Sequence, residues 1–212
     1  MKSMKRFAAA CTVALTLTAT SGLASANLLV NGGFEDDLDL NLNNGGIGTW
    51  GAFAAADVDG WDADNQIELW TNGFNGVPSY EGNRFAELNA DPGQPSAFTL
   101  FQDFATVADE LYTISFAYRA RSNNNESFDL SVGNLNLNLN DHTTGGWSVY
   151  SGTFTALSDT TRLMFTSVVP ETGTLGNFLD DVSVTQVPEP GTLALLGLGL
   201  AGIGVARRRK QS

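Results

Sequence analysis

The stretch Leu111-Tyr-Thr-Ile-Ser-Phe-Ala-Tyr-Arg-Ala-Arg121 decides the fold of this chain. Within it, Tyr112, Ile114, Phe116 and Tyr118 alternate with small, polar or charged residues. Successive side chains of a strand point to opposite faces, so this pattern predicts a β-strand with one buried aromatic face and one wet face.

The same two-residue alternation recurs through most of the region between residues 27 and 186. We expect further strands at residues 28–30, 67–70, 84–89, 97–104, 127–132, 147–155, 161–168 and 178–185. Clusters of Gly, Asn and Asp separate them, and we find no convincing helical period beyond a turn near residues 107–110. Many short strands with turn-rich spacing predict an all-β domain, an antiparallel jelly-roll β-sandwich.

Two segments alternate Leu strictly with a polar residue, Asp or Asn at residues 38–43 and Asn at residues 134–140. Alternation is compatible with an edge strand whose leucines point inward, although Asn is a poor strand former. We interpret the second segment as a strand and leave strand and loosely packed loop open for the first.

The first 26 residues have the pattern of a secretory signal peptide. Three basic residues precede an apolar run, and Ala24-Ser25-Ala26 forms a small-residue cleavage site, so the mature chain should begin after Ala26. Cys11, the one cysteine, lies too early for a lipoprotein cut, which would leave apolar residues on the wrong side.

The tail, residues 187–212, combines three devices in order. Pro188, Glu189 and Pro190 form a stiff extended peptide, residues 193–206 are apolar, and an Arg-Arg-Arg-Lys cluster follows. The apolar run is shorter than the roughly 20 residues of a comfortable transmembrane helix. It is therefore a weak anchor, or a temporary transmembrane anchor with a processing site in front.

This order resembles the PEP-CTERM sorting signal of bacterial exported proteins. The resemblance implies recognition by an exosortase and cleavage near the Pro-Glu-Pro. It also implies export through the inner membrane, with delivery to the cell surface or the extracellular matrix.

The region between the two terminal segments is strongly acidic. Seven of the eleven basic residues lie in those segments, which leaves four arginines against 22 acidic residues at positions 27–186. Nucleic acid and anionic membrane are therefore poor partners for the mature domain. Divalent cations and neutral glycans are compatible with this charge, and so is a simple solvated surface.

The two ends of the domain suggest a metal site. Alternation along residues 178–184 places Asp180 on the same face as Phe178, Val182 and Val184. A carboxylate on an apolar face needs donors or a cation, and Ca²⁺ takes six to eight oxygen ligands.

These ends also carry a second resemblance. The matching motifs are residues 28–35 (Leu-Leu-Val-Asn-Gly-Gly-Phe-Glu), Gly60-Trp61, residues 111–116 and residues 179–184 (Leu-Asp-Asp-Val-Ser-Val). Together they resemble the galactose-binding-domain-like superfamily, which includes many carbohydrate-binding modules. The resemblance implies a jelly roll with structural Ca²⁺ near the joined termini, held by Glu35 and by Asp180 or Asp181, and a sugar-binding face or loop set.

Aromatic side chains are the candidates for contact with a sugar ring. Trp70, Phe74 and Tyr80 lie in a turn-rich stretch, and we expect them to be exposed and to bind ligand. Trp61 and Trp147 we expect in the core.

Catalysis finds little support in the sequence. The single histidine, His142, lies in a polar segment, and neither a Gly-x-Ser-x-Gly motif nor a zinc-ligand spacing occurs. We therefore expect an exported, surface-sorted, non-catalytic protein that binds polysaccharide. The alternatives are a structural matrix protein of exopolysaccharide or biofilm without a specific ligand, and a carbohydrate-active hydrolase.

Overall fold

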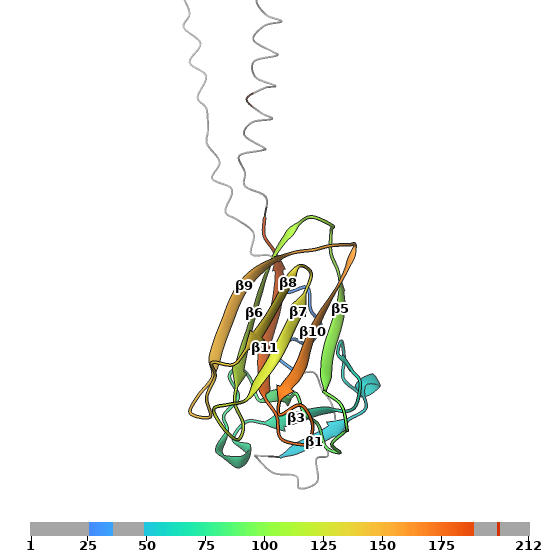
Figure 1. Ribbon diagram of the computed structural model, residues 1–212. Coiled ribbons are helices and arrows are strands. Elements are labelled where there is room, and N and C mark those ends of the chain that lie inside the picture. Colours follow the sequence, from blue (N-terminus) through green and yellow to red (C-terminus); the bar gives the residue numbers. More distant parts are fainter. Residues whose placement is uncertain (1–25, 36–48, 189–198, 200–212) are drawn as a thin grey trace, which may run out of the picture.

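The computed structural model describes residues 26–35, 49–188 and 199 (Figure 1). Two antiparallel sheets pack face to face and enclose one main hydrophobic core. The all-β sandwich expected from the sequence is confirmed.

One sheet has six strands and the other has five. In spatial order, the first contains β1 (Trp50–Phe53), β3 (Ile67–Thr71), β4 (Arg84–Glu87), β11 (Phe178–Gln186), β6 (Leu111–Arg119) and β9 (Ser148–Thr155). The second contains β2 (Asp62–Ala63), β5 (Thr99–Ala105), β10 (Thr160–Val169), β7 (Ser127–Val132) and β8 (Leu135–Leu139). Two short 3-10 turns, η1 (Ala55–Asp57) and η2 (Phe74–Gly76), lie between strands. From β4 onward the chain repeatedly crosses between the sheets, as in a jelly roll.

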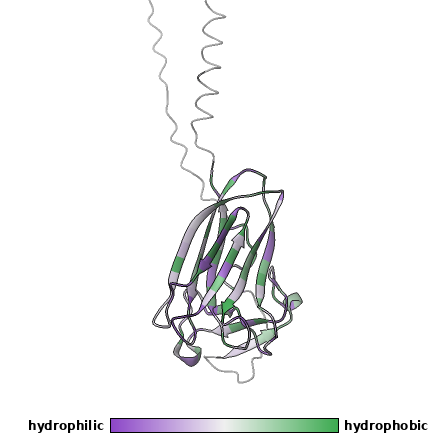
Figure 2. Ribbon diagram, viewed as in Figure 1, coloured by the Kyte–Doolittle hydropathy of each residue, from purple (hydrophilic) through white to green (hydrophobic). Residues whose placement is uncertain are grey.

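The core lies between the inner faces of the two sheets. Tyr112, Ile114, Phe116 and Tyr118 of β6 are all buried, as their alternation predicts. Phe116 meets Phe165 of the opposite sheet edge to face, with ring centroids 5.1 Å apart. Figure 2 shows hydrophobic and hydrophilic residues alternating along the strands, so that one face of each sheet lines the main core.

The structure differs from the sequence prediction at the start of the domain. Residues 28–30 are not a strand, but this opening segment lies beside β11. The Leu28 amide donates to the Val184 carbonyl (2.8 Å), and the Val182 amide donates to the Gly32 carbonyl (2.9 Å). The two ends of the domain therefore do meet, through isolated hydrogen bonds and without a regular ladder.

Within residues 134–140, Leu135–Leu139 form the edge strand β8, with leucines toward the core and asparagines outward, as predicted. The similar segment at 38–43 lies outside the described residues. The short strands β1 and β2 were not predicted.

The expected placement of Asp180 is wrong in one respect. A β-bulge interrupts the pairing of β11 with β6 between Asp180 and Ser183, and Asp181 has a φ of +47°. An extra residue reverses the alternation. Val182 consequently points into the main core, while Asp180 shares the outer face of the sheet with Phe178.

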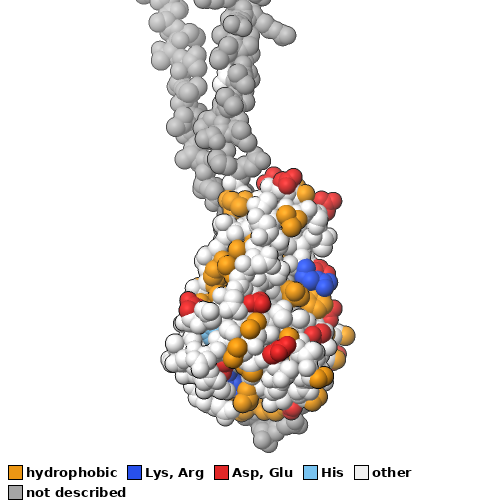
Figure 3. Space-filling model, viewed as in Figure 1, with side chains coloured by type: hydrophobic (Ala, Val, Ile, Leu, Met, Phe, Trp, Pro, Cys, Tyr) orange, Lys and Arg blue, Asp and Glu red, His pale blue; other side chains and the backbone are white. Residues whose placement is uncertain are grey.

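The signal peptide and the sorting helix fall outside the described residues. Within the part that the structure describes, no helix is long and apolar enough to cross a membrane. On the face seen in Figure 3, backbone and uncharged polar side chains make up most of the surface of the described residues, with scattered apolar and acidic side chains and few basic ones.

Candidate functional site

A second aromatic cluster covers the outer face of the six-stranded sheet. Trp70 of β3, Phe85 of β4 and Phe178 of β11 are all buried there. The Phe85 and Phe178 rings meet edge to face at 5.0 Å, and Trp70 lies 4.8 Å from Phe178. Phe74 and Val77 of the β3–β4 loop pack on this cluster. The loop, residues 72–83, is therefore fixed over the sheet by a small core of its own.

Two carboxylates from the ends of the domain hold this loop. Glu35 Oε1 accepts hydrogen bonds from the amides of Asn83 (2.5 Å) and Arg84 (2.7 Å). Asp180 Oδ2 accepts from the amides of Tyr80 (2.8 Å) and Glu81 (3.1 Å).

Asp180 is fully buried, and its Oδ1 accepts the amide of Asp181 at 2.7 Å. Burial raises the pKa of Asp180 to about 7, although three backbone amides oppose this rise. The loop is thus attached through a carboxyl group that titrates near neutrality.

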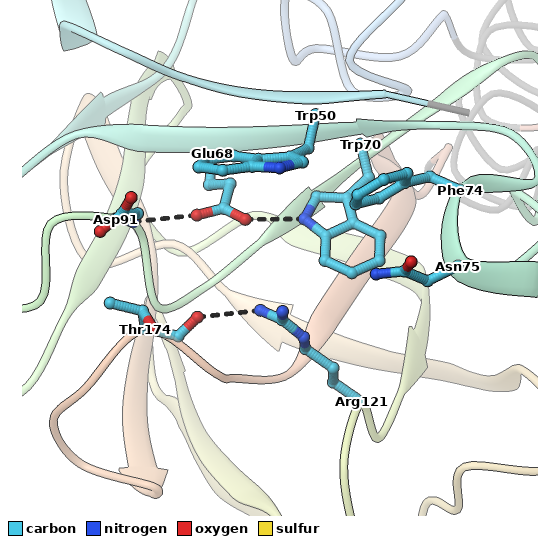
Figure 4. Close-up of a pocket in the computed structure, with 8 residues that line it drawn as sticks. All are labelled: Trp50, Glu68, Trp70, Phe74, Asn75, Asp91, Arg121 and Thr174. Atoms are coloured by element: carbon cyan, nitrogen blue, oxygen red, sulfur yellow. Dashed lines mark hydrogen bonds between the residues drawn. The ribbon is translucent and has the colours of Figure 1, made fainter. Parts of the chain in front are cut away.

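A pocket of about 200 Å³ opens at the edge of the loop (Figure 4). Its lining residues are Trp50, Glu68, Trp70, Phe74, Asn75, Asp91, Arg121 and Thr174. Trp50 stands directly opposite Trp70 in the β1–β3 register and is 36% exposed. Phe74 packs edge-on against Trp70, with centroids 4.6 Å apart. The pocket therefore combines an accessible indole with a ring of polar groups.

The carboxyl group of Glu68 organises one side of the pocket. Its Oε1 accepts the indole N–H of Trp70 (2.7 Å), and its Oε2 accepts the backbone amide of Asp91 (2.9 Å). Both bonds are drawn in Figure 4. Glu68 is 3% exposed, so these donors offset the cost of burying it.

Arg121 organises the opposite side. Its Nη1 forms an ion pair with Glu87 and also donates to the Thr174 carbonyl (2.8 Å). Its guanidinium lies 4.6 Å from the centre of the Trp70 ring, within range of a cation–π contact.

Glu87, which is buried and does not line the pocket, stands directly opposite Glu68 in the β3–β4 register. Burial, and then the charge of Glu68, raise the pKa of Glu87 well above its usual range, against the opposing effect of Arg121. Arg121, which pairs with Glu87, thus offsets part of the repulsion between the two neighbouring acids.

The structure separates the three aromatic residues predicted to bind ligand. Trp70 is only 2% exposed, so the expectation that it is exposed was wrong, although it forms part of the pocket wall. Phe74 also lines the pocket. Tyr80 is 46% exposed, and its ring centroid lies 6.2 Å from that of Trp147. It does not line the pocket.

Of the two tryptophans expected in the core, Trp61 is buried, as predicted, and Trp147 is only half-buried. Trp61 stacks on Phe34 at 5.1 Å. The indole N–H of Trp147 donates to the Pro78 carbonyl of the loop. His142, although its segment is polar, is itself buried, with Nε2 2.5 Å from Asn177 Oδ1.

The sequence prediction did not select Trp50, Glu68, Asp91 or Arg121 as binding residues. A signal existed for Glu68, because the alternation of residues 67–70 places it on the same face as Trp70. No comparable signal existed for the others, which only the strand register and the loops bring together.

The three acids predicted to bind calcium lie at the junction of the two ends. Glu35 is exposed and Asp180 is buried, and the oxygens described above accept backbone amides. Among the described residues, no three acidic, His or Cys side chains gather as a metal site would require. The acidic residues at 36–39 lie outside that part of the chain, and calcium stays a prediction.

Comparison with known families now places the chain. The sequence model of DUF642, a protein family of unknown function, matches residues 27–185. The chain belongs to the DUF642 family. Directly after this DUF642 region, residues 186–210 match the PEP-CTERM protein-sorting motif. The predicted sorting signal is thereby confirmed, and it implies export, processing by an exosortase and sorting to the surface.

One curated relative is halomucin from Haloquadratum walsbyi (strain DSM 16790 / HBSQ001), 24% identical over 167 residues. That alignment covers 77% of this chain and 2% of halomucin, so the DUF642 chain spans a small part of this relative.

Solved structures share the sandwich fold at low identity. The Stig cyclase Fisc from Fischerella sp. TAU aligns at 14% identity and a TM-score of 0.52, over 79% of this chain and 100% of that one. TmCBM61 in complex with β-1,4-galactotriose aligns at 17% identity and a TM-score of 0.48, over 77% and 100%. At 14% identity, the similarity of the DUF642 chain to Fisc concerns the fold alone.

Proposed function

We propose that this exported protein is a non-catalytic glycan-binding protein of the cell surface or extracellular matrix. The observation that carries the proposal is the pocket in which the accessible Trp50 faces Glu68, Asp91 and Arg121. A sugar ring has an apolar face and a rim of hydroxyls, and this combination of side chains matches both.

In this interpretation the ring stacks on the indole of Trp50, with Phe74 closing the apolar wall. Glu68 and Asp91 accept from sugar hydroxyls, while Asn75 and Arg121 donate. The pocket is smaller than the roughly 300–1,000 Å³ typical of drug-sized ligands, which suits a single sugar unit. We propose Tyr80, exposed on the same loop, as a more distant contact, and Trp70 as the support beneath the pocket.

The carboxyl groups of the pocket support binding without turnover. Every oxygen of Glu68 and Glu87 accepts from a protein donor: Trp70 and Asp91 serve the first, and Arg121 and the Gly176 amide serve the second. A glycosidase needs two carboxyl groups that flank the scissile bond. Here Glu87 does not line the pocket and is paired with Arg121, so Glu68 and Glu87 are not two accessible acids on either side of a bound sugar.

The proposed partners follow from the tail and the site. A sorting enzyme of the exosortase type would cut near residues 188–190 and release the domain from its transient membrane anchor. The domain would then hold polysaccharide at the surface. A calcium ion at Glu35 with Asp180 or Asp181 would stabilise the joined ends and would not take part in binding.

The test is retention of the purified chain on an array of immobilised polysaccharides. A detergent keeps the apolar tail in solution, and it must have no sugar head group that could compete for the pocket. We expect at least one polysaccharide to retain the wild type, and Trp50→Ala to reduce retention at least tenfold. Leu157→Ala, at an exposed position (68%) remote from the pocket, is the matched control and should bind normally. Tyr80→Ala measures the second aromatic contact.

Absence of retention by any polysaccharide would refute the proposal and favour a structural matrix protein without a specific ligand. Release of reducing sugar from the retained polysaccharide would instead favour a hydrolase.

A further inference from the structure

A second hollow adjoins the pocket on the far side of Thr174. Thr174 lines both, and Arg121 of the first is followed in sequence by Ser122 of the second. The second hollow measures about 410 Å³ and opens between the β6–β7 loop and the residues that follow β10.

The two hollows are separated by a fixed bridge, the hydrogen bond from Arg121 Nη1 to the Thr174 carbonyl (2.8 Å). The bridge is held from below, because Glu87 binds Arg121 and also accepts the Gly176 amide at 2.7 Å. A ligand longer than one unit would therefore lie across a rigid ridge and need not displace it.

The wall of the second hollow mixes apolar and hydroxyl-bearing side chains. Val169 and Leu175 are 42% and 46% exposed there and give the hollow an accessible apolar side. Ser122, Thr172 and Thr174 supply the hydroxyl groups.

The carboxyl group of Glu126, the acid of this hollow, is fully buried and accepts the amides of Arg121 (2.6 Å), Ser122 (2.6 Å) and Asn123 (3.0 Å). The accessible wall is thus uncharged. It suits a neutral, amphipathic ligand.

We propose that the glycan is a neutral oligosaccharide of at least two units, which crosses the Arg121–Thr174 bridge. One unit occupies the aromatic pocket at Trp50, and the next lies in the second hollow against Leu175. This inference rests on the proposed function and adds to it a chain-length requirement and a second contact surface.

The experiment uses oligosaccharides of one to six units, prepared by partial acid hydrolysis of the polysaccharide that the array identifies. Their affinity for the purified chain is measured by calorimetry in the same sugar-free detergent. We expect affinity to rise at least tenfold from one unit to three. Leu175→Ala should lower the affinity for three units about fivefold, the order expected for one partly buried aliphatic contact. The same variant should leave the affinity for a single unit unchanged.

The controls distinguish a failure of the extended site from a failure of the pocket at Trp50. Trp50→Ala should weaken every length, and Leu157→Ala none; near-ultraviolet circular dichroism confirms that each variant is folded. Equal affinity for one and three units, or full affinity of Leu175→Ala for three units, would overturn the extended site while leaving the pocket intact. If no polysaccharide is retained at all, the proposed function fails and the extension fails with it.

Discussion

Asp180 should make the domain less stable as the pH rises from 4 to 8. The pKa of this buried carboxyl is raised to about 7, whereas an aspartate in the unfolded chain titrates near 3.9. Between these values the folded state binds more protons than the unfolded state, so stability falls with increasing pH. The difference between the two pKa values corresponds to a loss on the order of 4 kcal/mol, or roughly 8–16 °C in melting temperature.

The assay is thermal unfolding of the wild type and of Asp180→Asn at one-unit steps between pH 4 and 8. The asparagine side chain does not titrate. Its NH₂ group takes the place of Oδ1, which in the wild type accepts the Asp181 N–H, so the variant loses this hydrogen bond at a cost of ~1 kcal/mol. We therefore expect the wild type to be more stable at pH 4 and the variant more stable at pH 8.

Other titrating groups, Glu87 among them, contribute equally to the pH dependence of both proteins. Their contribution therefore cancels when the melting temperature of the variant is subtracted from that of the wild type. Parallel stability curves for the two proteins would refute the reasoning. A bound calcium ion would hold Asp180 ionised, so the crossing should disappear in calcium and return with chelator if the predicted site exists.

Four further predictions concern the loop, the pocket, the metal and the tail. Gly82 has a φ of +56°, and a Cβ there would overlap the carboxylate of Glu35, so Gly82→Ala should lower the unfolding free energy by about 1–3 kcal/mol in chemical denaturation. Arg121→Met leaves Glu87 buried without its cation, and the same assay should show a loss of about 3–5 kcal/mol. If calcium binds the joined ends, chelator should lower the melting temperature by several degrees, and NaCl of equal ionic strength should not restore it. Replacing residues 188–190 by alanine should leave the protein in the membrane fraction with its tail attached, as judged by its size on a gel; normal release of mature-sized protein would contradict this.

Local patterns predicted the sandwich because burial of one strand face leaves a direct mark on the sequence. The alternation at residues 111–121 appears as β6, which ends at Arg119, and the alternation at 127–132 appears as β7. The Asn-Leu repeat at 134–140 contains the edge strand β8. The strand β1 left no such mark, because Trp-Gly-Ala-Phe at 50–53 is short and not alternating.

The pocket could not be predicted in the same way, because it depends on register and on one irregularity. Trp50 reaches Trp70 only through cross-strand pairing between segments 20 residues apart in the sequence, and Arg121 enters from a third element. The bulge at Asp180 and Asp181 reverses the alternation of β11, so parity alone placed Asp180 in the wrong environment.

The acids chosen as metal ligands and the aromatics chosen as sugar contacts belong to one structural unit. Glu35, on the opening segment, and Asp180, on the last strand, both hold the β3–β4 loop by its amides. That loop carries Phe74 and Asn75 to the pocket and leaves Tyr80 exposed. Both ends of the domain therefore help to shape the pocket, because each end supplies one of the two carboxylates that hold the loop forming one of its walls. Loss of either carboxylate should weaken ligand binding even though neither lines the pocket.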